Sequence, residues 1–129
     1  MSLARTLGVA AVLLVVGYVL FSRFSQGGRA MTPDEFLAAY EPEHTLIDAR
    51  TSREYATGHL AGALNLNVLD SDFRERADTL PRDQPVYLYC ASGHRSGRAA
   101  GILEDMGFEA VYNVGGIGAL ARAGADLAP

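Results

Sequence analysis

The sequence predicts an α/β domain, a parallel sheet of about five short strands with helices over both faces, preceded by one apolar N-terminal helix. Short apolar runs alternate along the chain with segments that carry helix-start and helix-stop signals. This alternation favours parallel pairing, because helices then cross over between neighbouring strands. Length is the third observation, since residues 31–129 provide enough chain for one hydrophobic core.

The apolar N-terminal segment is Leu7–Phe21, which is uncharged, mostly aliphatic and flanked by Arg5 and Arg23. At ~1.5 Å per residue it covers about 22 Å of a hydrocarbon core that is roughly 30 Å thick. Leu3–Phe24 reaches a full span if the two arginines extend to the interfaces. The same run fits the apolar region of a cleaved secretory signal. We favour an uncleaved transmembrane helix, a signal-anchor, within residues 1–24.

Composition excludes several classes of function for the rest of the chain. A short tether at residues 25–30 leads to a domain at 31–129 that carries 8 Arg, no Lys and 15 Asp or Glu. This acidic charge argues against binding nucleic acid or lying on anionic lipid. One cysteine excludes an intramolecular disulfide, and no Cys/His spacing predicts a metal site. We expect a monomer that holds no metal or cofactor.

The first half of the domain contains two short helices and two short strands. Thr32–Glu35 supplies a capping residue, a proline at the first helical position and two acids, so a helix begins there. Thr45–Asp48 is an apolar run that ends on a carboxylate, which predicts a buried strand. Thr51–Glu54 fits a capping box and opens a brief helix that Gly58 ends. Ala63–Leu66 predicts the next strand.

The second half follows the same alternation. Asp72–Ala77 is predicted to be helical, and Pro81–Pro85 is predicted to be a loop. Val86–Tyr89 is an apolar strand bounded by proline. Ser96–Met106 has apolar residues at helical spacing and a glycine directly after it. Ala110–Val114 is the last strand, and a pair of glycines then turns the chain into an Ala-rich helix.

The loop after Val86–Tyr89 has the composition of a reactive site. Cys90 lies at the carboxyl end of this strand, where parallel α/β sheets bind ligands. A thiolate there faces the free N–H groups of the following helix, and adjacent positive charge lowers its pKa below the free value of roughly 8.5. The alternative is a cysteine that only fills space in the core. The candidate residues around the nucleophile are Ala91, Ser92, Gly93, His94, Arg95 and Ser96.

These residues have distinct expected roles in a cradle for an oxyanion or a sulfur anion. Gly93 lets the backbone turn so that several amides point inward. Arg95 adds a full positive charge, and His94 adds part of one when it is protonated.

Three motifs resemble the rhodanese family. CASGHRS (residues 90–96) resembles the active-site loop Cys-x-x-Gly-x-Arg-Ser/Thr. LIDARTSREYATGHLAGALNL (residues 46–66) resembles the stretch with Asp-x-Arg, Glu-Tyr/Phe and Gly-His-Ile/Leu-x-Gly-Ala-x-Asn, and NVGGI (residues 113–117) resembles the closing Gly-Gly motif. The resemblance covers nearly the whole domain and is greatest to exported single-domain members of the phage-shock-protein-E type.

The resemblance implies a rhodanese fold and a sulfurtransferase without cofactor. In this family the cysteine, here Cys90, takes the sulfane sulfur of thiosulfate, releases sulfite and passes the sulfur from a persulfide to a thiol or cyanide. Asp48 and Arg50 match Asp-x-Arg and would brace the loop, or form a purely structural ion pair. Glu54 and His59 match as scaffold positions. Ala91 stands where many members have Arg, so the donor stays open.

Two other functions compete with turnover. Phosphatases and arsenate reductases of related fold place five residues between Cys and Arg, whereas four separate Cys90 from Arg95. The shorter loop suits a single sulfur atom. A non-turnover sulfur carrier or binding module on the same fold also needs the persulfide, so the sequence leaves it open.

The position of the domain relative to a membrane is predicted from flanking charge. Arg5 and the terminal amine precede the apolar run, and Arg23 and Arg29 follow it, so the positive-inside rule gives nearly a tie. The resemblance to exported proteins favours a single-pass membrane protein with its domain on the periplasmic face. The alternatives are a domain on the cytoplasmic face and a secreted domain after signal cleavage.

Overall fold

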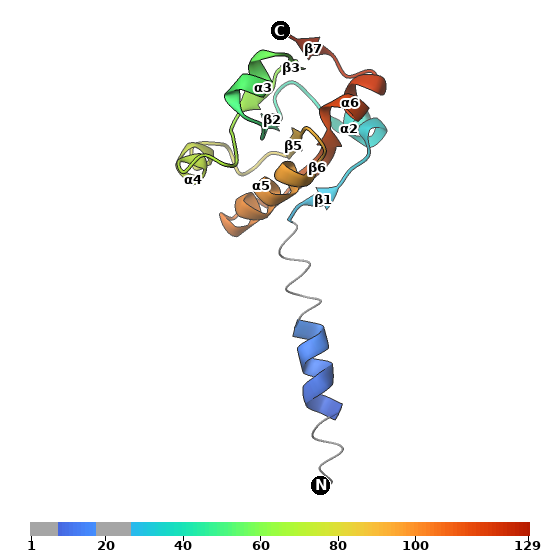
Figure 1. Cartoon of the computed structure of the whole chain (residues 1–129), viewed down its shortest axis with the longest axis vertical. Helices are drawn as coiled ribbons and strands as arrows, with labels where there is room; N and C mark the ends of the chain where they lie inside the picture. Colours follow the sequence, from blue (N-terminus) through green and yellow to red (C-terminus); the bar gives the residue numbers. More distant parts are fainter. Residues whose placement is uncertain (1–7, 18–26) are drawn as a thin grey trace.

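The computed structural model describes residues 8–17 and 27–129, and residues 8–17 form a helix (Figure 1). The rest of the predicted anchor Leu7–Phe21 lies outside the described residues. Within the part of the chain that is described, no helix is both long enough and apolar enough to cross a membrane. The predicted transmembrane helix is therefore not confirmed.

A five-stranded parallel sheet forms the centre of the domain, as predicted (Figure 1). Its strand order is β1-β6-β5-β2-β4, so β5 and its neighbours hold the middle. The strands are β1 (Arg29–Ala30), β2 (Thr45–Asp48), β4 (Leu64–Asn65), β5 (Val86–Cys90) and β6 (Val111–Gly116).

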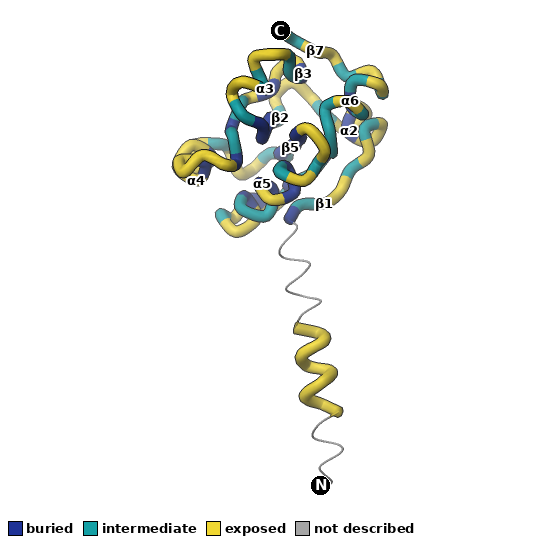
Figure 2. The backbone as a smooth tube through the Cα atoms, viewed as in Figure 1, coloured by how far each residue is buried: buried dark blue, intermediate teal, exposed yellow. Residues whose placement is uncertain are grey.

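Helices cover both faces of the sheet, because successive apolar side chains of β5 point to opposite faces and both sets must be buried. Val86, Leu88 and Cys90 pack on one face, whereas Tyr87 and Tyr89 pack on the other. Every residue of β5 is buried, and Figure 2 shows this burial at the centre of the domain. The first face is covered by α4 (Phe73–Ala77) and α5 (His94–Asp105), and the second by α2 (Pro33–Ala39), α3 (Ser52–Ala56) and α6 (Ile117–Arg122).

The predicted helix starts are present. Thr32 caps α2 by accepting the Glu35 backbone N–H, and Thr51 and Glu54 form both hydrogen bonds of the capping box on α3. Helix α3 ends at Ala56 and is followed by its C-cap Thr57 and then by Gly58, whose φ of +137° is a conformation that L side chains rarely adopt.

Several boundaries differ from the prediction. Helix α5 begins at His94 rather than Ser96, because Gly93 adopts a left-handed conformation and starts the helical turn two residues earlier. Strand β6 continues to Gly116, so the glycine pair ends the strand instead of following it.

The predicted tether at 25–30 is too long. Arg29–Ala30 is the edge strand β1, which pairs with β6, and the Gly28 backbone N–H donates to the Glu104 carboxylate on α5. The antiparallel pair of β3 (His59–Leu60) and β7 (Leu127–Ala128) was also not predicted. Two-residue strands carry too little periodicity to be recognised from sequence.

Candidate active site

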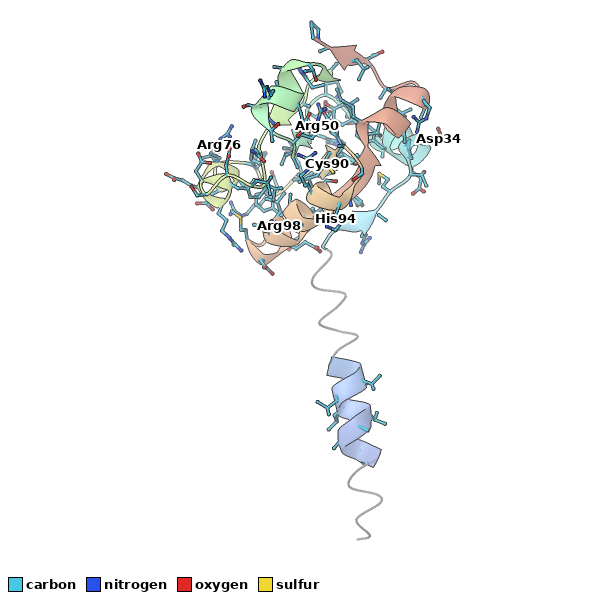
Figure 3. The ribbon with its side chains drawn as sticks, in the orientation of Figure 1. Asp34, Arg50, Arg76, Cys90, His94 and Arg98 are labelled. Atoms are coloured by element: carbon cyan, nitrogen blue, oxygen red, sulfur yellow. The ribbon has the colours of Figure 1, made fainter. Side chains whose placement is uncertain are left out.

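The strand-to-helix turn after β5 places the cysteine in front of α5. Cys90 is the last residue of β5, and α5 begins four residues later at His94; Figure 3 labels both residues. A Cβ on Gly93, which has φ +92°, would lie 3.2 Å from Gly115 Cα. A Cβ on Gly116 would lie 2.6 Å from the Ala91 carbonyl oxygen. The loop therefore packs against the end of β6 only because both sides carry glycine.

The Cys90 sulfur is fully buried and accepts hydrogen bonds. The Gly93 N–H lies 3.0 Å from Sγ, and the Ser96 hydroxyl oxygen lies 3.4 Å from it. Burial is the largest single effect and raises the pKa of the Cys90 thiol. Hydrogen bonds from the Ser96 side chain and from the backbone N–H groups of Ser96, Ser92 and Gly93 together outweigh burial, so the pKa lies below its usual value. This arrangement favours the thiolate, which is the nucleophilic form of cysteine.

The lowered pKa predicts a pH-dependent signal from the only thiol in the chain. We expect the ultraviolet absorbance of the thiolate to appear at lower pH in the folded chain than in the chain unfolded by guanidinium. Ionisation of Cys90 therefore also contributes to the free energy of unfolding. This contribution is fully present above the pKa of the unfolded thiol and is lost as the pH falls through the pKa of the folded thiol. Subtracting the titration of Cys90→Ser removes the tyrosine signal, and equal midpoints in the folded and unfolded chains would contradict the expectation.

Arg95 contacts α3 rather than the sulfur. Its guanidinium donates to both carboxylate oxygens of Glu54, at 2.7 Å and 2.9 Å. These hydrogen bonds are the main reason that the pKa of Glu54 falls to about 2. The pKa of Arg95 is raised, first by Glu54 and to a smaller extent by the charge of Cys90. Glu54, expected only as a scaffold position, therefore anchors the loop through Arg95.

Asp48 and Arg50 form a buried ion pair at the carboxyl end of β2. The Arg50 side chain donates to both Asp48 carboxylate oxygens at 2.7–3.1 Å, and also to the Gly58 carbonyl at 2.7 Å. Asp48 lies directly beside Tyr89 of β5 in the sheet. Arg50 thus links the segment that precedes α3, the helix that carries Glu54, to Gly58, which follows it. The pair supports the loop indirectly, because none of the hydrogen bonds found among the described residues joins Asp48 or Arg50 to Cys90.

The other predicted loop residues differ in their exposure to solvent. Ala91, Ser92 and His94 are exposed, whereas Ser96 is fully buried beneath the turn. A hollow of about 360 Å³ adjoins the loop and is lined by His94, Gly93 and residues of β1, β6 and α5. Among the described residues no group of three or more His, Cys, Asp or Glu could hold a metal ion.

Asn113 is a site residue that sequence analysis did not identify. It lies on β6 and makes hydrogen bonds with Ser96, Gly93 and Gly115. Two of these partners, Gly93 and Ser96, donate hydrogen bonds to the Cys90 sulfur. Its place as the first residue of NVGGI was visible, but nothing in the sequence indicated that its side chain reaches across to α5.

Comparisons with known proteins find similar sequences and a similar fold. A family model described as rhodanese-like domain matches residues 32–123. Thiosulfate sulfurtransferase PspE of Escherichia coli (strain K12) is 32% identical over 94 residues, covering 73% of this chain and 89% of that protein. YqhL of Bacillus subtilis (strain 168) is 36% identical over 105 residues, covering 81% and 79%. The crystal structure of a rhodanese-related protein from Thermoplasma volcanium has a TM-score of 0.68 at 27% identity, covering 78% and 97%. The matched range contains every site residue described above.

Proposed function

This chain belongs to the rhodanese family, and on that premise we propose that it moves a sulfane sulfur from thiosulfate or a similar donor to a thiol or cyanide through a Cys90 persulfide. The family assignment supports the sulfurtransferase class. The observation that carries the proposal is the position of the Cys90 sulfur, at the end of a central strand and among inward-pointing N–H groups.

The proposed reaction has two displacement steps. The Cys90 thiolate attacks the outer sulfur of thiosulfate, a new S–S bond forms, and the old S–S bond breaks with its electron pair leaving on sulfite. A thiolate or cyanide then attacks the outer sulfur of the persulfide, and the electron pair of the broken bond restores the Cys90 thiolate. Each step moves negative charge off or onto the Cys90 sulfur, and hydrogen bonds to charged groups are the strong ones. The Gly93 and Ser96 donors serve this purpose and no proton transfer is needed.

A steady-state assay separates turnover from a carrier role. The chain is mixed with thiosulfate and cyanide in large excess, and thiocyanate is measured over time. A turnover enzyme produces many equivalents of thiocyanate per protein molecule. A carrier that receives its sulfur from another donor would release at most the one equivalent that it already holds, and that outcome would contradict the proposed enzyme.

Arg95 supplies the next prediction. We expect Arg95→Ala to slow sulfur loading by about tenfold or more, because it removes a positive charge that interacts with Cys90 and also releases the loop from Glu54 on α3. A loss of ~1.4 kcal/mol of transition-state stabilisation corresponds to that tenfold change. Glu54→Gln leaves the positive charge of Arg95 in place but weakens the contact that anchors its side chain. The effect of Glu54→Gln on the loading rate should therefore be smaller than that of Arg95→Ala.

Arg53→Ala is the matched control, because it removes the same charge from an exposed position next to Glu54. Its loading rate should stay close to that of the unmutated chain. An Arg95→Ala rate equal to the Arg53→Ala rate would show that the backbone amides suffice.

We further propose that the domain lies on the periplasmic face, held by the segment Leu7–Phe21. The support is the apolar composition of that segment and the likeness to exported family members. Alkaline phosphatase fused after Pro129 should be active, and a fluorescent protein that matures only in the cytoplasm should stay dark when fused there. A bright fluorescent fusion with an inactive phosphatase would place the domain in the cytoplasm.

A further inference from the structure

The orientation of the Asn113 side-chain amide is fixed by two backbone groups. Its Nδ2 group donates to the Gly93 carbonyl at 2.9 Å, and its Oδ1 atom accepts the Gly115 N–H at 3.2 Å. A carbonyl only accepts and a backbone N–H only donates, so the amide cannot be turned around without losing both bonds. Toward any third group, Oδ1 can therefore act only as an acceptor.

The third group is the Ser96 hydroxyl, which lies between Asn113 and Cys90. Its oxygen is 2.8 Å from Asn113 Oδ1 and 3.4 Å from Cys90 Sγ, and Ser96 is fully buried. A hydroxyl has one proton, so it donates either to Asn113 or to the sulfur but not to both. When it donates to Asn113, its lone pairs face the sulfur and favour the neutral S–H. When it donates to the sulfur, it stabilises the negative charge.

We propose that Asn113 is a positioning residue that competes with Cys90 for the single proton of the Ser96 hydroxyl. Ionisation then proceeds in a defined way. The Cys90 proton leaves to solvent, the Ser96 O–H turns from Asn113 to the sulfur, and Asn113 Oδ1 keeps the Gly115 N–H as its partner. No buried polar atom loses every hydrogen bond in either state, so both states are accessible without the penalty of an unsatisfied group.

This inference rests on the proposed role of Cys90 as an ionised nucleophile. Its test measures ionisation of the sulfur and not sulfur transfer. If thiosulfate fails to load sulfur while the competition is observed, the proposed function fails and the inference stands. If loading occurs without the competition, the inference fails alone.

The experiment is a double-mutant cycle on the full chain, with Asn113→Ala, Ser96→Ala and the double variant. The ultraviolet absorbance of the thiolate gives the ionised fraction of Cys90 at a fixed pH below the midpoint of the titration. Removing Asn113 leaves the Ser96 proton to the sulfur, so the ionised fraction should rise. Removing Asn113 also frees the Gly93 carbonyl, but that effect is present with or without the Ser96 hydroxyl and cancels in the cycle.

Asn113→Ala should raise the ratio of ionised to neutral Cys90. We expect this increase to be roughly two- to tenfold larger when Ser96 is present than when it is alanine, as the net worth of one hydrogen bond implies. A purely structural Asn113 would give the same increase in both backgrounds. An equal increase in both backgrounds, or a larger increase when Ser96 is alanine, would overturn the proposal.

A second variant and a direct measurement keep the test decisive if Asn113→Ala does not fold. Asn113→Val removes the acceptor and places a β-branched residue, which suits a strand, at the same position in β6, so it should raise the ionised fraction of Cys90 as Asn113→Ala does. In the unmutated chain, the Asn113 side-chain amide signals in an NMR titration should move together with ionisation of the sulfur. Signals that stay constant through that transition would contradict the competition.

Discussion

Cys90→Ser is expected to lower the turnover of thiosulfate and cyanide by at least about a thousandfold, because it removes the only thiol on which a persulfide can form. Serine keeps the size of the side chain nearly unchanged, and its oxygen can accept the Gly93 N–H that now points at the sulfur. The loss should therefore be chemical rather than structural. Thiocyanate production in the steady-state assay measures it.

The folded state of Cys90→Ser is checked in parallel. Its thermal unfolding midpoint should stay close to that of the unmutated chain, since the loop keeps its glycines and the Arg95–Glu54 contact. Turnover within tenfold of the unmutated rate would mean that sulfur moves without this cysteine, and the proposed mechanism would be wrong.

Asp48→Asn is expected to lower the free energy of unfolding by about 3–5 kcal/mol, because it leaves the charge of Arg50 buried without a counter-charge. Both side chains are almost inaccessible, at 0% and 7% exposed, and their closest N···O distance is 2.7 Å. A loss of this size is a large fraction of the total stability of an ordinary domain, which is roughly 5–15 kcal/mol. Chemical denaturation of the full chain measures it.

Asp78→Asn is the matched control for this prediction. The Asp78–Arg82 pair has the same N···O distance of 2.7 Å, but its side chains are 69% and 38% exposed. Solvent screens such a pair, so the control should change the free energy of unfolding by no more than about 1 kcal/mol. A second comparison is the double variant Asp48→Leu/Arg50→Met, which removes both charges and should recover much of the lost stability. Equal effects of Asp48→Asn and Asp78→Asn would show that burial of the pair does not matter.

The fold was predictable wherever the relevant interactions are local. Thr45–Asp48 has the bounds given by its apolar pattern, and the capping box of Thr51 and Glu54 is formed by residues three apart. The alternation of strands and helices was enough to predict a parallel sheet with two covered faces. The pair of β3 and β7 was missed because neither two-residue strand carries a pattern, and the pairing joins residues far apart in the chain.

The candidate site divides in the same way. Cys90 and its loop are contiguous in sequence, so their composition and position after an apolar strand identified them. The Arg95 contact with Glu54 joins residues 41 positions apart, and Asn113 reaches Ser96 over 17 positions. Such contacts depend on the register between β2, β5 and β6, which only the folded structure fixes. The sequence therefore indicated Cys90 and its loop as the candidate site, but not the side chains that position the loop.

The central claim is that Cys90 carries the sulfur, and the mass of the intact protein tests it most directly. The reduced chain is incubated with thiosulfate, freed of small molecules and weighed by mass spectrometry, and the same sample is weighed again after addition of cyanide. We predict a gain of one sulfur atom that cyanide removes and that Cys90→Ser does not acquire. No gain in the unmutated chain, or a gain that persists in Cys90→Ser, would contradict the account.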